Sequence, residues 1–393
     1  MAARICMLVH QDFFRDARVK RYTDALLERG AEVDVICVRS GDAEQPVSYH
    51  ENLKVYPIPM KRGYRGVVDY LLEYTWGFLL YFLRLTSLSL RRRHQAIHVH
   101  NMPDFFVFTT AVPKMLGAEI ILDIHDPMPE FYASKFERSM DSWMVRIMRW
   151  QEHLSARVAD VMVTVNDAVK HNLSLRGIPD QKITVVSNFP DPHIFVRQPA
   201  AQGEESPFTL IYPGTLASRY GLHVAINALP QIRQSIPGVC LVLLGHQVDY
   251  VKELEDLAQE LQVADCVDIR DVVPIGQVPA AMAQADLGIY PALYDIHMDV
   301  ATPTKVLEYA MMGLPILATR LSGIEAIFDD AAVSYVPPGN VEAFAQAVID
   351  LHADPGKRAE LVKQADVEFT STHSWAQEFN KYVDLLRSLG LSV

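Results

Sequence analysis

The segment 303–316 combines residue types that can bind a phosphate beside a diol. Thr304 and Lys305 stand at the start of a predicted helix, and Glu308 follows three residues later, beside Lys305 on one helix face. The N–H groups and positive dipole end of a helix N-terminus attract an anion, and Lys305 adds a full charge. The carboxylate of Glu308 can accept hydrogen bonds from two vicinal hydroxyls. Together these features are typical of a sugar-nucleotide site, although for an isolated helix the preferred interpretation is an ordinary capped helix with both charged residues on its solvent-exposed face.

A second segment, 212–221, follows an apolar run and could bind the same anion. Its glycines, Gly214 among them, allow a ligand to approach the backbone closely, and the Thr215 hydroxyl is a donor. The planar guanidinium of Arg219 can donate two parallel hydrogen bonds to phosphate oxygens. Arg219 and Lys305 together could neutralise a departing diphosphate without a metal. The alternative interpretation is a solvated arginine in a turn.

The run Pro-Thr-Lys-Val-Leu-Glu-Tyr-Ala-Met-Met-Gly-Leu-Pro-Ile at 303–316 resembles the signature of family 4 of the retaining glycosyltransferases (glycosyl transferases group 1), which have the GT-B fold. In that family the Glu that matches Glu308 holds the ribose of the donor nucleotide. Many members carry another Glu near the donor sugar, at the position that is Val300 here. Asp299 or Asp295 could replace it.

The resemblance extends to other loops. It implies that the backbone of 271–274, which includes Val273, borders the base, and that His125 lies against the reacting sugar. Asp126 and Glu130 follow His125 in a proline-rich loop and could orient the acceptor hydroxyl, or could cap the next helix. The resemblance also implies front-face attack, in which the leaving phosphate takes the acceptor proton.

Two further groups of polar residues lie in the first half of the chain. His98 and His100 occupy alternate positions of a predicted strand and share one face, which could bind a metal. The spacing places no third ligand, so we expect neither a metal nor a cofactor. Asp16 and Arg18 are weaker candidates on the acceptor side.

Length and composition limit the number of domains and the classes of function that are possible. The 393 residues exceed one ordinary core, and half of them are apolar, so two folded domains are expected. A formal net charge of −12 disfavours broad nucleic-acid binding, because no global positive field is available for phosphates. The first residues lead directly into a strand-like run and are too short for a signal peptide, and four cysteines lack metal-ligand spacing. We therefore expect a cytoplasmic protein, at most attached to the inner face of the cell membrane.

The pattern of apolar runs predicts an α/β protein of the GT-B class, with two Rossmann-like doubly wound domains that face a central cleft. Apolar runs alternate with amphipathic helical segments in both halves, and a polar Pro/Gly stretch separates them. The predicted parts are an acceptor-binding domain at 1–195, a linker at 196–207, a nucleotide-sugar-binding domain at 208–372, and a terminal helix at 373–393 that could cross back to the first domain. The predicted strands are 5–9, 33–38, 97–100, 119–123, 161–165, 183–186, 208–212, 239–244, 267–269, 287–290, 316–318 and 333–336.

The stretch 61–93 predicts contact with an anionic membrane. Its centre, 67–90, is rich in Leu, Tyr, Phe and Trp, and basic residues flank it on both sides. Asp69, Glu73 and Arg84 interrupt the apolar run, so a spanning helix is not expected. An interfacial helix and a helix buried against the sheet remain alternatives.

These features predict a retaining, metal-independent hexosyltransferase-type enzyme. It would move a sugar from a UDP- or GDP-linked donor to a hydroxyl of a lipid-linked or cell-envelope glycan. A GT-B-type epimerase or phosphorylase, or a non-catalytic sugar-nucleotide sensor, remains an alternative. A dehydrogenase is disfavoured, because the loop 10–16 after the first strand lacks the glycine fingerprint of dinucleotide binding.

Overall fold

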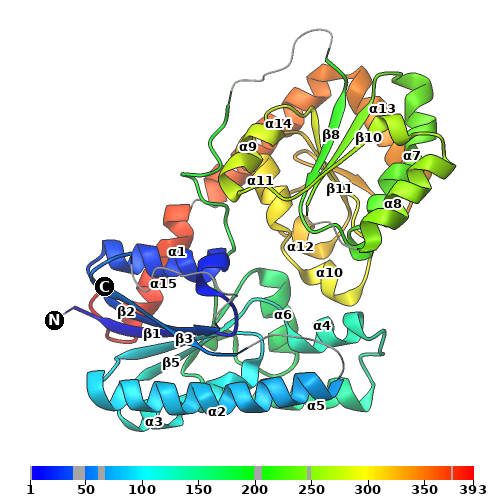
Figure 1. The fold of residues 1–393 in the computed structure, drawn as a ribbon. Helices are drawn as coiled ribbons and strands as arrows, with labels where there is room; N and C mark the ends of the chain where they lie inside the picture. Colours follow the sequence, from blue (N-terminus) through cyan, green and yellow to red (C-terminus); the bar gives the residue numbers. More distant parts are fainter. Residues whose placement is uncertain (1, 39–48, 61–66, 199–205, 246–248, 373–374) are drawn as a thin grey trace. The chain divides into compact units, whose positions relative to one another are not determined.

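The computed structural model describes residues 2–38, 49–60, 67–198, 206–245, 249–372 and 375–393, and the chain divides into two compact units. Unit 1 comprises 1–187 and 376–393, and unit 2 comprises 188–375. Each unit is one parallel β-sheet with helices packed on it (Figure 1). The prediction of two Rossmann-like sheets is therefore confirmed.

The seven strands of unit 1 follow the order β3-β2-β1-β4-β5-β6-β7, and their pairings are parallel. The order reverses between β1 and β4, and ligands of open α/β sheets bind beyond the carboxyl ends of strands at such a switch point. The strands are β1 (Arg4–Val9), β2 (Glu32–Val38), β3 (Leu53–Ile58), β4 (Ala96–His100), β5 (Glu119–Ile124), β6 (Val161–Thr164) and β7 (Ile183–Val185).

β3 was not among the strands predicted from the sequence. Lys54 and Pro57 interrupt its apolar run and weaken the strand signal. β3 pairs with β2 and forms one edge of the sheet, where the missing N–H of a proline is tolerated.

The helices of unit 1 include a segment from the far end of the chain. The last helix packs on unit 1 through Tyr382, whose hydroxyl lies 2.9 Å from His98 Nδ1, and through buried Glu378, whose carboxylate accepts from the backbone N–H of Ser187 at 2.9 Å. These helices are α1 (Ala17–Glu28), α2 (Val67–Arg92), η2 (Asp104–Thr110), α3 (Ala111–Met115), α4 (Met128–Lys135), α5 (Trp143–Val158), α6 (Asp167–Leu175) and α15 (Trp375–Ser388).

The six strands of unit 2 follow the order β10-β9-β8-β11-β12-β13, again with parallel pairings. The order reverses between β8 and β11, which gives this unit a switch point of its own. The strands are β8 (Thr209–Pro213), β9 (Cys240–Leu244), β10 (Val267–Arg270), β11 (Leu287–Tyr290), β12 (Ile316–Thr319) and β13 (Ser334–Val336). The helices are α7 (Leu222–Ser235), α8 (Asp249–Glu260), α9 (Val278–Met282), α10 (Ile296–Val300), α11 (Thr304–Met312), α12 (Ser322–Glu325), α13 (Val341–Ala353) and α14 (Pro355–Thr372).

The segment predicted as a linker, 196–207, falls largely outside the described residues, because 199–205 are not described. Its first part packs on unit 2. The guanidinium of Arg197 pairs with Asp366 and donates to the carbonyl oxygen of Ala310 at 3.0 Å.

Candidate functional site

The position of α11 is fixed by one aromatic side chain. The Tyr309 hydroxyl lies 3.0 Å from the carbonyl oxygens of both Ile211 on β8 and Ile289 on β11. Its ring packs on Gly288, where an added Cβ would lie 2.5 Å from Tyr309 Cγ. A side chain at this glycine would displace the ring, so the Gly–Tyr pair holds α11 against the switch point of unit 2.

The N-terminal half of α11 carries the two charged residues that the sequence singled out, Lys305 in the first turn and Glu308 at the start of the second. Lys305 Nζ lies 3.3 and 3.2 Å from the two carboxylate oxygens of Glu308. The Glu308 side chain is only 6% exposed, whereas that of Lys305 is 24% exposed. A Cβ on Gly214 would lie 3.1 Å from Lys305 Cε, so the lysine stem rests on the loop after β8. The structure thus brings Lys305, Glu308 and Gly214 together, as expected.

Glycines allow three loops to converge at this end of the sheet. A Cβ on Gly245, after β9, would lie 2.0 Å from the carbonyl oxygen of Gly214. A Cβ on Gly221 would lie 1.9 Å from the carbonyl oxygen of Pro291, after β11, and Gly221 has a positive φ of 64°. The backbones of these loops are therefore too close for any side chain at either glycine.

Arg219 lies near the end of the same loop and faces the segment after β11. Its terminal nitrogen lies 3.2 Å from His297 Nδ1 and 3.9 Å from an Asp295 carboxylate oxygen. The side chain is 31% exposed. Two cationic groups, Arg219 and Lys305, therefore border the 214–221 loop, one at each end, and each has an acidic neighbour.

The remaining residues predicted for the donor site, Thr304, Thr215 and Val273, lie on three separate elements of unit 2. Thr304 is the first residue of α11 and Pro303 is its N-cap, without a side-chain cap bond. Thr215 is exposed in the loop after β8. Val273 follows β10, which is two strands away from β8 in the sheet.

The carboxylates considered as substitutes for the missing glutamate are both engaged. The two carboxylate oxygens of Asp299 accept from the N–H and the hydroxyl of Ser322, each at 3.0 Å. Asp295 caps α10 by accepting from the backbone N–H groups of His297 and Met298, both at 2.8 Å. Val300 is buried. These contacts favour structural roles for Asp299 and Asp295.

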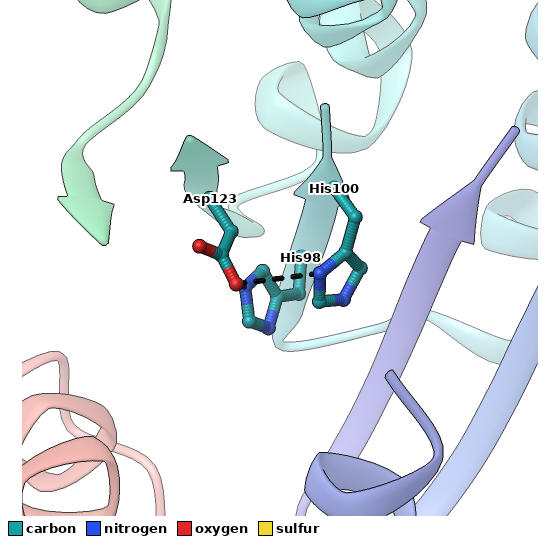
Figure 2. A group of neighbouring side chains, drawn as sticks. All are labelled: His98, His100 and Asp123. Atoms are coloured by element: carbon teal, nitrogen blue, oxygen red, sulfur yellow. Dashed lines mark ion pairs between the residues drawn. The ribbon is translucent and has the colours of Figure 1, made fainter. Parts of the chain in front are cut away.

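Unit 1 has a buried polar cluster at the carboxyl ends of β4 and β5, where Figure 2 shows His98, His100 and Asp123. Arg18, on α1, donates to both carboxylate oxygens of Asp123 at 3.0 Å. Asp123 Oδ2 also lies 3.5 Å from His98 Nε2, 3.4 Å from His100 Nδ1 and 3.1 Å from His125 Nε2. One buried carboxylate thus joins a guanidinium and three imidazoles.

The charges within this cluster follow from burial and pairing. Burial opposes ionisation of Asp123, but Arg18 and the neighbouring histidines hold the pKa of Asp123 well below its usual range. Burial lowers the pKa of His98, and it lowers the pKa of His100 well below its usual value. The negative charge of Asp123 and the positive charge of Arg18 therefore cancel, and the imidazoles of His98 and His100 are neutral.

The structure supplies a third potential metal ligand, Asp123, that the sequence spacing did not reveal. The side-chain arrangement nevertheless fits a cation poorly. Arg18 already binds both oxygens of Asp123, and its charge would oppose an adjacent metal ion. The nearest ring nitrogens of His98 and His100 both face Asp123 Oδ2, at 3.5 and 3.4 Å, so the carboxylate that Arg18 pairs with already occupies the point on which they converge. We interpret the cluster as a positioning network.

His125 stands at the edge of this network. Its side chain is 18% exposed, and Asp123 contacts its Nε2. The side chain of buried Asn101 fixes the surrounding loop: its Oδ1 accepts from the backbone N–H of His125 at 2.8 Å and its Nδ2 donates to the carbonyl oxygen of Asp126 at 2.6 Å. His125 is thus positioned through both its ring and its backbone, and Asp126 lies beside it with intermediate exposure.

Two predicted acceptor residues have structural partners. The carboxylate of Asp16 caps α1 by accepting from the backbone N–H groups of Arg18 and Val19, at 3.1 and 3.0 Å. Glu130 is buried, and Arg176 binds it at 2.5 Å. This burial favours a role in packing α4 over contact with an acceptor.

The positioning roles of Asp123 and Asn101 were not predicted from the sequence. Alternation along a strand places residues two apart on the same side, so Asp123 and His125 could have been linked by spacing alone. Asn101 precedes a second loop, and its contact with the backbone of 125–126 depends on the pairing of β4 with β5, which no local pattern reveals.

Comparison with known proteins identifies the family. The protein-family model described as "Glycosyl transferase 4-like domain" matches residues 16–188. The family model described as "Glycosyl transferases group 1" matches residues 207–354. The chain belongs to the group 1 glycosyltransferases, of the GT4-like type. The resemblance inferred from 303–316 is therefore confirmed.

Family members with curated names match only in part. The putative colanic acid biosynthesis glycosyltransferase WcaL of Escherichia coli is 27% identical over 212 residues, covering 53% of this chain and 52% of WcaL. The GDP-mannose-dependent α-(1-6)-phosphatidylinositol monomannoside mannosyltransferase of Mycolicibacterium smegmatis is 30% identical over 175 residues, covering 44% of this chain and 46% of that enzyme. The chain thus spans about half the length of the curated relatives it matches.

Solved structures show that the fold is GT-B. Sucrose-phosphate synthase from Thermosynechococcus elongatus superposes with a TM-score of 0.80 at 16% identity, covering 98% of this chain and 99% of that one. Anabaena HepE in complex with UDP has a TM-score of 0.75 at 15% identity, covering 98% of this chain and 100% of HepE.

Proposed function

We propose that this chain is a retaining glycosyltransferase that transfers a sugar from a UDP- or GDP-linked donor to a hydroxyl of a cell-envelope glycan or lipid-linked acceptor. In this proposal unit 2 binds the donor and unit 1 binds the acceptor. Membership of the group 1 family supports the class of reaction.

The observation that carries the proposal is the Lys305–Glu308 pair near the N-terminus of α11, against Gly214 at the switch point of unit 2. A helix N-terminus with a lysine attracts a diphosphate, and a nearly buried carboxylate can accept from ribose hydroxyls. The two side chains now bond to each other. Donor binding would exchange that bond for one from Lys305 to phosphate and one from the ribose to Glu308.

In the proposed reaction the C–O bond between the sugar and the diphosphate breaks, and negative charge grows on the departing phosphate. Lys305, Arg219 and the N-terminal end of α11 would stabilise this charge, which is the main requirement for catalysis. The acceptor oxygen would attack from the same face, and its proton would pass to the departing phosphate. His125 would contact the reacting sugar, with Asp123 and Asn101 fixing its orientation.

The donor is named from its chemistry and from two relatives. The curated mycobacterial relative is described as GDP-mannose-dependent, and HepE has been solved with UDP-glucose. The acceptor class is supported by relatives named for colanic acid and phosphatidylinositol mannoside synthesis.

A thermal-shift screen of UDP, GDP and ADP, with their glucose and mannose conjugates, tests the donor site. We expect stabilisation by one nucleotide and a weaker shift for Lys305→Met and Glu308→Gln. Loss of one charged hydrogen bond costs about 1.5–3 kcal/mol, which weakens binding by roughly 10- to 150-fold.

The control is the exposed pair Glu360–Lys363 on α14, which has the same residue types at the same spacing. Lys363→Met should leave the nucleotide shift unchanged. Equal shifts for all three variants and the wild type would contradict the assigned site. Release of nucleotide in the presence of acceptors, with the product anomer assigned by NMR, then separates a retaining transferase from a sensor, an epimerase or a phosphorylase.

A further inference from the structure

One face of α2 is apolar and exposed. Five large apolar side chains on this helix have exposed fractions between 44% and 64%. At about 100° per residue their positions fall within an arc of roughly 60°, so they form one stripe. The opposite face is buried: Tyr81 and Leu85 are fully covered. The exposed residues are Leu72, Trp76, Leu79, Leu83 and Leu90.

A second exposed stripe lies on α5. Trp143, Ile147 and Trp150 are 69%, 47% and 65% exposed, and Arg146 and Arg157 are also exposed. These five residues occupy an arc of roughly 100° of the helix. One helix face thus combines two tryptophans and two arginines.

The charges of the two helices are sorted by face. Among the acidic residues on α2 and α5 whose side chains the structure describes, Glu73 turns inward to His10 and buried Glu152 pairs with Arg176. The exposed charged side chains that the structure describes on the two helices are basic, including Arg84 and Arg91, although exposed Asp141 precedes α5. The described side chains of both helices therefore present apolar and cationic groups outward and carboxylates inward.

The two stripes belong to neighbouring elements. Both α2 and α5 pack on η2, and Figure 1 shows both helices along the same side of the sheet of unit 1. Three of the four tryptophans of the chain lie on them, as Trp76, Trp143 and Trp150. Tryptophan with arginine on one helix face is typical of the membrane–water interface, where the ring sits at headgroup level and the cation meets anionic lipid.

We propose that the exposed faces of α2 and α5 together form a docking surface for an anionic lipid bilayer. The helices would lie in the interface, with the apolar side chains entering the acyl boundary and the arginines contacting lipid phosphates. Among the described residues no helix combines the length and apolar character needed to cross a bilayer, which fits surface attachment. This inference extends the sequence prediction for 61–93 to α5, and it does not depend on the proposed donor chemistry.

The test is co-sedimentation of the full chain with phosphatidylcholine vesicles, with and without phosphatidylglycerol. We expect binding that requires the anionic lipid, with a blue shift of tryptophan fluorescence. The double variant Trp143→Ser/Trp150→Ser should weaken binding at least tenfold. The charge variant Arg146→Gln/Arg157→Gln should bind less well and depend less on anionic lipid, since only the basic residues of α2 would remain.

The matched control is Leu175→Ser on α6, an equally exposed apolar residue of unit 1, 73% exposed, which should bind as the wild type does. All the substituted side chains are exposed, so melting temperatures should agree, and nucleotide-induced stabilisation should persist in each variant. Wild-type binding by both double variants would overturn the proposal. So would a dimer in light scattering that the same substitutions dissociate, because the stripes would then cover a second copy of the chain.

Discussion

Gly288→Ala should displace α11 from the switch point of unit 2. The added methyl carbon would lie 2.5 Å from Tyr309 Cγ and 2.7 Å from both Cδ atoms, whereas carbon atoms in contact prefer about 3.5–4.0 Å. The ring must therefore move by about 1 Å. The Tyr309 hydroxyl lies 3.0 Å from two strand carbonyls, so this movement also strains the contacts that hold the helix.

The cost of such overpacking is about 1–3 kcal/mol. For a unit of this size that corresponds to a fall in melting temperature of roughly 2–12 °C. Because Lys305 and Glu308 belong to the same helix, affinity for the stabilising nucleoside diphosphate should fall as well. Calorimetric titration and a thermal scan measure the two effects on one sample.

Gly238→Ala is the matched control, since a Cβ there meets nothing within 4 Å. It should be neutral or slightly stabilising. If Gly288→Ala keeps both the wild-type melting temperature and the wild-type nucleotide affinity, the Gly–Tyr pair does not position the helix, and the reasoning is refuted.

Two further predictions concern unit 1. Asp123→Asn should lower the free energy of unfolding by about 3–5 kcal/mol, because it leaves the buried guanidinium of Arg18 without its anion; a loss below about 1 kcal/mol in urea unfolding would contradict the network. Burial raises the pKa of Asp104 to about 7, so the folded state retains a proton that the unfolded chain releases above its ordinary pKa of 3.8. Its contribution to stability therefore falls as pH rises from about 4 to 7, and Asp104→Asn should gain stability relative to the wild type between pH 5 and pH 8; parallel pH curves in urea unfolding would contradict this assignment.

Local patterns were enough to predict α11 and the two parallel sheets. The helix 304–312 has a Pro before it and a Gly after it, and its charged pair follows from helical spacing. The edge strand β3 was missed because its lysine and proline mask a short apolar run. The inward turn of Glu130 toward Arg176 could not be predicted, because the two residues are distant in sequence and meet only in the folded unit, where Arg176 follows α6.

The exposed stripe on α5 shows a different limit of sequence reasoning. Trp143, Ile147 and Trp150 have the spacing of a core-facing stripe, so periodicity alone predicts burial. The side of the helix that faces the sheet is instead marked by buried Val145 and Glu152, and Glu152 forms an ion pair with Arg176, which follows α6. Which face of an amphipathic helix is covered depends on tertiary partners.

A crystal structure with the nucleoside diphosphate that stabilises the protein most would test the central claim most directly. We predict that the diphosphate lies beside Lys305 and Arg219 at the 214–221 loop, and that the ribose hydroxyls donate to Glu308 in place of the present bond from Lys305. A nucleotide bound away from α11, with the Lys305–Glu308 bond intact, would contradict the account.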